Sequence, residues 1–490
     1  DGGDYTISGL TITSTTADDA AIGLFGVVDG GTVKNLNLED VSINVTNSDL
    51  AGAAIGMMLN GATADYITVS GTIIGYDGVG GIVGRLIIDG TISNCINNAS
   101  VTSSYGGIGG IVGKAYYEDG ANTSTFASVT KCTNKGTVTA PMYIGGIAGL
   151  ARANVTDCIN EGAIVGGTQT GGIVGQLIAA GTVSGNENKA KVSGKNHLGG
   201  IIGDYSQSNA YTYYNVSIAN NINRGELAAT EQCAAIMGCN NIDGFTAMTA
   251  TGNVSYYYVE GLELFGNPED MVIDATNEFI IEAADFATFK TAVEAGINVT
   301  LTADITTTAA ITTSGVSSVV DLNGKTLTIG AGDNQFNDES NITIKNGVIN
   351  ITGVTVGGNA IFRLDEYEKT LVTTMTLENV NIIGDGYSSA YGIFYIGDSS
   401  VLNVIGGEWE LKNDTHTAGG VFKADASAAT LNIEGTKITA HNVRRFVTYA
   451  ATEIDNATIA LSGDDDEVDA EMEHGFNRSP LAISNSTITM

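Results

Sequence analysis

The chain has 490 residues, and its 54 acidic and 21 basic side chains give a formal net charge of −33. A polyanion repels phosphate backbones, so we expect no nucleic acid among its partners. Hydrophobic residues make up 43% and charged residues only 15%, a balance that favours a folded chain over disorder. No apolar run reaches the roughly 18 residues of a membrane-spanning helix, so we expect no membrane insertion in this segment.

A short glycine phrase, Gly-Ile-x-Gly or a close variant, recurs through the first half of the chain. A second phrase, typified by Cys95-Ile96-Asn97, follows each clear copy. The interval between copies runs from 26 residues (146 to 172) to 36 residues (110 to 146). A unit of this size repeated in fixed order is typical of stacked-repeat proteins. The copies begin at Gly23, Gly81, Gly110, Gly146, Gly172 and Gly200.

Each repeat contains short runs rich in Val, Ile and Thr, separated by Gly and Asn, without a helical period. Such runs suit strands, and identical coils can bury their apolar faces by parallel pairing. Connections between parallel strands prefer the right hand. We therefore predict an all-β fold, a right-handed parallel β-helix. The Gly-Gly pairs 80–81, 109–110, 145–146, 171–172 and 199–200 would permit either a positive φ at a corner or a close approach of coils.

The repeats resemble the Glug motif, a glycine-rich repeat of bacterial surface proteins. The stretch 23–36 is similar to a full copy of the motif, and the resemblance covers roughly residues 5–255. It implies a β-solenoid at a bacterial cell surface, in proteins usually regarded as non-catalytic and adhesin-like. The first residues lack the plan of a signal peptide, so we expect either export through a leader that has been removed or a chain cut from a longer protein.

The second half of the chain follows a different pattern. Residues 285–296 form the one good helical pattern, with Asp285 as N-cap and Gly296 as the stop signal. Strand-like runs follow directly, an opening similar to pectate-lyase-like β-helices, in which a short amphipathic helix covers the first coil. We therefore predict two consecutive modules, 1–265 with Glug-type repeats and 266–490 opened by this capping helix. Later coils align at Asn379, Gly406, Gly435, Asn456 and Asn485.

Five cysteines in so long a chain exclude a disulfide scaffold. Cys95, Cys132 and Cys158 occupy one repeat position, which Leu36 fills in an earlier copy, so we expect an inward-facing column of free thiols. Cys233 and Cys239 either form a disulfide with each other or pack in the hydrophobic core as free thiols. The four histidines are scattered without ligand-like spacing.

Two insertions predict a ligand-binding surface. Most repeats pass from the last glycine of the phrase to the next strand in 6 to 8 positions, as from Gly26 to Val33, whereas two take about twice as many. Both insertions leave the same corner of their coils, and tyrosine suits stacking on sugars or anchoring a protein. The alternative is that these rings only cover the corner. The insertions carry Tyr116, Tyr117, Phe126, Tyr205, Tyr211, Tyr213 and Tyr214.

An acidic run near the C-terminus is the one candidate for a metal site. Several neighbouring carboxylates suit Ca²⁺, although the spacing of an EF-hand is missing, so a weak calcium site competes with a solvated loop. We expect no other cofactor. The carboxylates are Asp464, Asp465, Asp466 and Glu467.

Together these patterns favour a non-catalytic, extracellular or cell-surface adhesin-like protein. It would be a monomer that presents an elongated surface to a glycan or to a protein of the host or another cell. One alternative is a polysaccharide lyase or glycoside hydrolase on the second module, where Arg444 and Arg445 adjoin His441 and Asp425 precedes them by one coil. The other alternative is a structural surface stalk.

Overall fold

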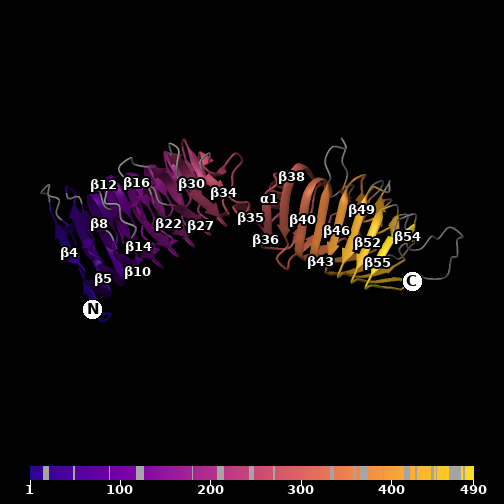
Figure 1. The fold of residues 1–490 in the computed structure, drawn as a ribbon, viewed down its shortest axis with the longest axis horizontal. Helices are drawn as coiled ribbons and strands as arrows, with labels where there is room; N and C mark the ends of the chain where they lie inside the picture. Colours follow the sequence, from indigo (N-terminus) through magenta and orange to yellow (C-terminus); the bar gives the residue numbers. More distant parts are fainter. Residues whose placement is uncertain are drawn as a thin grey trace. The chain divides into compact units, whose positions relative to one another are not determined.

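The computed structural model divides the chain into two compact units, Asp1–Phe279 (unit 1) and Ile280–Met490 (unit 2), and each is considered by itself. Within each unit, strands of successive turns lie side by side (Figure 1). The residues that the structure describes are 1–14, 21–47, 50–87, 89–116, 126–178, 180–206, 215–241, 248–268, 271–330, 336–356, 360–364, 373–389, 391–412, 420–424, 428–442, 446–448, 450–462, 476–477 and 481–489.

The predicted parallel β-helix is confirmed. One coil of unit 1 consists of β13 (Val112–Ala115), β14 (Ala127–Thr130), β15 (Thr133–Asn134) and β16 (Val138–Gly145). Each strand pairs in parallel with its counterpart in the next coil, namely β17 (Ala148–Ala151), β18 (Ala153–Thr156), β19 (Ile159–Asn160) and β20 (Ile164–Gly171). Because equivalent residues stack directly, one apolar position repeated along the sequence becomes a continuous buried column.

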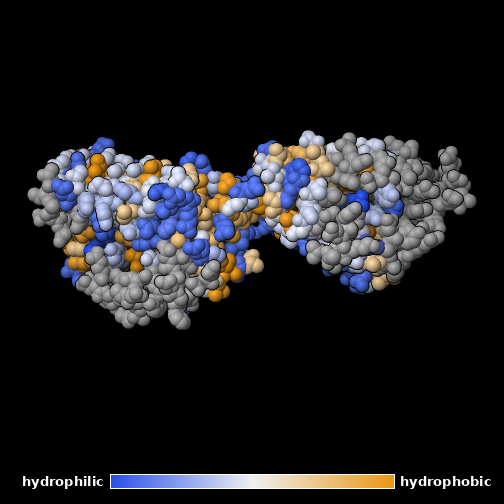
Figure 2. All heavy atoms as spheres, turned by 90° about the horizontal axis from the view of Figure 1, so that it is seen from above, coloured by the Kyte–Doolittle hydropathy of each residue, from blue (hydrophilic) through white to orange (hydrophobic). Residues whose placement is uncertain are grey.

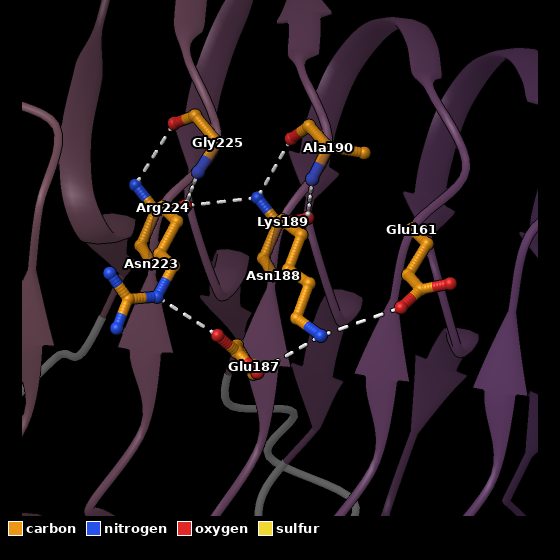
Figure 3. Close-up of polar contacts among 8 residues, drawn as sticks. All are labelled: Glu161, Glu187, Asn188, Lys189, Ala190, Asn223, Arg224 and Gly225. Carbon is orange, nitrogen blue, oxygen red and sulfur yellow. Dashed lines mark hydrogen bonds and ion pairs between the residues drawn. The ribbon is translucent and has the colours of Figure 1, made fainter.

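A column of buried asparagines runs through the interior of unit 1. Asn134 Nδ2 donates to Asn160 Oδ1 at 2.8 Å and to its own turn at Gly136 O at 2.9 Å. Figure 3 shows the same pattern where Asn188 donates to Asn223, while Lys189 and Arg224 reach Glu187 on the outer face. Every asparagine of the column is fully buried, and each side-chain amide hydrogen-bonds to the next one, so no polar group of the column is left unpaired. Its members are Asn97, Asn134, Asn160, Asn188 and Asn223.

The Gly-Gly pairs allow a close approach rather than a positive φ. A Cβ on Gly110 would overlap the Asn134 side chain and the Gly146 carbonyl oxygen of the next coil. The same overlap recurs at the second glycine of the other clear pairs, and none of these glycines has a positive φ. Glycine is thus required here because the coil is too thin for any side chain opposite asparagine.

A different corner does need the left-handed conformation. The residue before the cysteine or asparagine position has φ of +52° at Asn94, +54° at Lys131, +55° at Asp157 and +66° at Gly185. Asn, Asp and Gly tolerate this region best, which explains their recurrence there.

Unit 1 continues past residue 265, where the first module was expected to end. The strand β34 (Met271–Ile273) pairs with β31 (Met248–Thr251), and Glu278 and Phe279 pair with β32 (Val254–Ser255). Parallel strand pairing therefore continues beyond the last copy of the glycine phrase, and the boundary between the two units lies between Phe279 and Ile280.

The predicted helix of unit 2 is confirmed as α1 (Phe286–Glu294). Asp285 caps it by accepting a 2.9 Å hydrogen bond from Thr288 N, and Gly296 follows with φ +74°. The Phe289 and Val293 side chains are buried, and the helix packs on β36 (Asn298–Leu301) and β38 (Ile311–Asp321).

The coils of unit 2 surround a column of stacked aromatic rings. Equivalent strands β42 (Phe362–Leu364), β45 (Phe394–Ile396) and β48 (Phe422–Ala424) place Phe362, Phe394 and Phe422 in register. The ring centroids are 4.9 Å and 5.7 Å apart, and Trp409 packs against the last two rings. All four side chains are fully buried.

The coil alignment predicted for unit 2 is also confirmed. Glu378, Ile405, Glu434, Asp455 and Ser484 are in register, so the residues that follow them stack at one corner. Each of those residues has a positive φ, from +49° to +69°, as a corner of this kind requires. They are Asn379, Gly406, Gly435, Asn456 and Asn485.

Candidate functional site

From Arg85 onward, a row of side chains that are all polar except Leu150 follows the glycine phrase along one edge of unit 1. The residue directly after the last glycine of each phrase stacks on its equivalent in the next coil. We call these residues the polar row. Most are buried, although this position precedes a surface loop. In chain order they are Arg85, Lys114, Leu150, Gln176, Asp204 and Cys239.

A row of tyrosines lies beside the polar row, just before the Gly-Gly pairs. Tyr76 and Tyr105 are 39% and 45% exposed, and their rings stack with centroids 5.4 Å apart. Tyr143 of the next coil stands two positions further on, in line with Gly107 because Ile144 pairs with Ile108, and its ring lies beside Gly106. Burial, followed by the charge of Tyr105, raises the pKa of the Tyr143 hydroxyl, so Tyr143 remains a neutral donor. We call these three residues the tyrosine row.

An ion pair connects the two rows. Lys114 Nζ lies 2.7 Å from Asp77 Oδ2, and the two side chains are only 11% and 17% exposed. Asp77 Oδ1 accepts a 2.8 Å hydrogen bond from Gly78 N. Because both carboxylate oxygens are engaged and poorly hydrated, the pair is held in one geometry next to Tyr76.

The two described end residues of the first insertion, Tyr116 and Phe126, each pack their ring against an arginine of unit 1. The Arg85 guanidinium is 5.6 Å from the Tyr116 ring centroid, and the Arg152 guanidinium is 5.8 Å from that of Phe126. These are cation–π distances. Tyr116 and Phe126, both predicted ligand-binding residues, therefore border the polar row from the loop side.

The structure contradicts the prediction that Tyr205 lies on the ligand-binding surface formed by the insertions. Tyr205 belongs to β26 (Ile202–Ser206), pairs with Leu177 and is 0% exposed. It occupies the inward position that Leu86, Ala115 and Ala151 fill in other coils, so its ring is part of the core. The sequence placed it in the insertion because that insertion was taken to begin at Gly203, whereas the strand extends to Ser206.

Several other predicted residues lie outside the described part of the chain. They are Tyr117, Tyr211, Tyr213 and Tyr214 of the insertions, the carboxylates Asp464, Asp465, Asp466 and Glu467, and Asp425, Arg444 and Arg445. His441 is described, and its Nδ1 lies 2.9 Å from Ser462 Oγ.

The cysteine column lies where it was predicted, inside unit 1. Cys95, Cys132 and Cys158 are free and 0% exposed, at the position that Leu36 and Ile67 fill earlier in the chain. A hydrogen bond with Cys132, together with burial, raises the pKa of the Cys95 thiol well above its usual value. Asn186 takes over the position in the next coil, where its Oδ1 accepts from Cys158 N at 2.9 Å.

Cys233 and Cys239 form no disulfide with each other. Cys239 ends the polar row, and its thiol lies close to the His197 ring and the Asp204 carboxylate. The ligand atoms of these three residues all lie within 4.8 Å of one another. Sequence reasoning missed this group because each residue belongs to a different phrase. The signal was the register: Asp204 and Cys239 both follow the last glycine of their copies.

The face of unit 1 seen in Figure 2 mixes hydrophilic with scattered hydrophobic residues. Within the described residues, no helix is long and apolar enough to cross a membrane.

Comparison with known proteins gives one partial relationship. No family model matches the chain. Over 87 residues, 18% of the chain, it is 40% identical to halomucin of Haloquadratum walsbyi (strain DSM 16790 / HBSQ001), and the match spans 1% of that protein.

Proposed function

We propose that the chain is a non-catalytic, adhesin-like extracellular protein that binds a glycan of a cell surface through the tyrosine row and the polar row of unit 1. The stacked, half-exposed rings of Tyr76 and Tyr105 carry this proposal. Aromatic rings offer apolar faces and edges to the C–H groups of sugars, and tyrosine adds a hydroxyl for hydrogen bonding.

The neighbouring polar groups support the same function. Sugar recognition needs donors and acceptors held in place, because a group that is already ordered loses little entropy on binding. The Lys114–Asp77 pair provides such groups beside Tyr76, and Gln169 hydrogen-bonds to Tyr143. Parallel stacking places Tyr76 and Tyr105 on neighbouring coils, about 4.8 Å apart along the edge, which suits an extended chain of sugars better than a single residue.

The described flanks of the insertions fit this proposal, because they adjoin the polar row. The insertions begin directly after β13 and β26, the strands that carry Lys114 and Asp204 of the polar row. The resemblance to the Glug motif supports a bacterial cell-surface location.

A glycan array with the whole chain tests the proposal. We expect the double variant Tyr76→Ala/Tyr105→Ala to bind its glycan about tenfold more weakly than the unchanged protein. The matched control is Tyr5→Ala/Tyr66→Ala, which removes two rings that are 79% and 57% exposed elsewhere in unit 1. Equal loss in both double variants would contradict a site at the tyrosine row.

A second comparison separates the insertions from the strands. The variant Tyr117→Ala/Tyr213→Ala removes one ring from each insertion and keeps the tyrosine row. Weaker binding by this variant would make the insertions part of the site. An intact chain that binds no glycan at all would favour the structural stalk.

A further inference from the structure

Three metal-ligating side chains meet on the buried edge of unit 1. His197 belongs to β25 (Asn196–Gly199), Asp204 to β26 and Cys239 to β30 (Cys233–Asn241). Asp204 and Cys239 are directly paired on neighbouring coils, and His197 faces them across the Gly-Gly corner. Asp204 is 0% and Cys239 2% exposed, whereas the His197 side chain is 24% exposed.

The buried Asp204 carboxylate favours a cation beside it. Its Oδ2 accepts a 2.8 Å hydrogen bond from Gln176 Nε2, and Gln169 Nε2 lies 3.4 Å away. A divalent cation bound by Asp204 would offset the cost of burying its carboxylate. Asp204 Oδ1 points toward His197 Nδ1 at 3.5 Å.

We infer that His197, Asp204 and Cys239 bind one divalent transition-metal ion of the zinc type. Imidazole, carboxylate and thiolate are together ligands that Zn²⁺ accepts, whereas Ca²⁺ and Mg²⁺ prefer oxygen alone. Ligand atoms around tetrahedral Zn²⁺ are about 3.3–3.8 Å apart, given bonds of about 2.0–2.3 Å, so small side-chain movements close the site. Three protein ligands leave the fourth position to water.

The neighbouring amides are placed as outer partners of such a site. Gln176 orients the carboxylate so that its other oxygen faces His197, and Asn267 Nδ2 donates to Cys239 Sγ at 3.7 Å. Outer partners of this kind orient the ligands of a metal and strengthen its binding. The partial exposure of His197 leaves a route for the ion.

The same three residue types also form nucleophilic triads, but this geometry argues against one. In a triad the histidine separates the acid from the nucleophile. Here all three ligand atoms approach one another, so the Asp204 charge acts on the thiol directly. On binding, a metal ion displaces the thiol proton of Cys239.

Titration of the chelator-treated whole chain tests the inference. We expect one Zn²⁺ per chain in calorimetry at a site that His197→Gln and Cys239→Ser each abolish. With Co²⁺ in place of Zn²⁺, the site should show a thiolate-to-metal charge-transfer band. Gln176→Ala should weaken binding by about tenfold without removing the band.

The matched control is Cys233→Ser, which removes a thiol from the same strand and should keep both the Zn²⁺ and the cobalt band. Circular dichroism verifies that each variant folds, and the part-exposed His197 provides a variant that leaves the core untouched. Binding that persists in His197→Gln and Cys239→Ser, or a cobalt spectrum without a thiolate band, would overturn the assignment.

Discussion

Asn97 Nδ2 donates a hydrogen bond of 2.9 Å to Asn134 Oδ1, although the two residues are 37 positions apart in the sequence. Both side chains are fully buried, and each also bonds the backbone of its own turn. The column thereby ties neighbouring coils together through side chains as well as through strands. A single break leaves two unsatisfied amides in the interior.

Asn134→Ala should therefore destabilise unit 1 by about 3 kcal/mol, because Asn97 loses its acceptor and Asn160 its donor. The midpoint of urea unfolding, followed by circular dichroism, measures the effect. Thr133→Ala, at the adjacent half-buried position, is the control and should change stability by less than about 1 kcal/mol. Equal effects of both changes would mean that the column adds no stability of its own.

Gly110→Ala should cost about 2–3 kcal/mol, since the added methyl group would overlap the Asn134 side chain and the Gly146 carbonyl oxygen. Gly31→Ala serves as the comparison, because its Cβ would meet only Val28 Cγ1 at 3.3 Å. Thermal unfolding of the two variants distinguishes them. A well-tolerated Gly110→Ala would show that the coil can widen.

Lys131→Gly should stabilise the protein by about 1 kcal/mol. Lys131 holds a left-handed φ of +54°, which is strained for a residue with a Cβ and free of strain for glycine. Lys135→Gly, four positions further on and without a positive φ, should instead be destabilising. The urea unfolding midpoints of the two variants measure these changes. A loss of stability in both variants would show that the positive φ at Lys131 is not strained.

The thiol of Cys233 should react with iodoacetamide slowly at neutral pH and faster as the pH approaches 11. Burial raises its pKa to about 11, and the thiolate that reacts forms only as the pH rises toward that value. Mass spectrometry of the native chain at increasing pH follows the alkylation. The fully buried Cys95, Cys132 and Cys158 should stay unmodified while the chain is folded.

The same shift makes stability depend on pH. A thiol whose pKa is higher in the folded than in the unfolded chain stabilises the fold at low pH. The unfolded chain loses the proton first, so this contribution declines from about pH 9 and is gone above pH 11. Melting temperatures of the chain and of Cys233→Ala should diverge least at alkaline pH. A constant difference across this range would contradict the raised pKa.

Much of the architecture was predictable from the sequence alone. Periodic phrases identify the coils, the shared position of Cys95, Cys132 and Cys158 marks an inward wall, and Asp285 and Gly296 delimit the helix. Each of these features depends on local conformation or on a period, and both are properties that the order of residues expresses directly.

Only the tertiary structure decided which side chains meet across a corner. The proximity of His197 to Asp204 and Cys239, and the buried position of Tyr205, follow from where β25, β26 and β30 end and how the coils stack. Coil lengths vary because insertions of different size leave the same corner, so distance along the chain does not reveal these contacts. Parallel pairing restores the register, and with it the neighbours of each side chain.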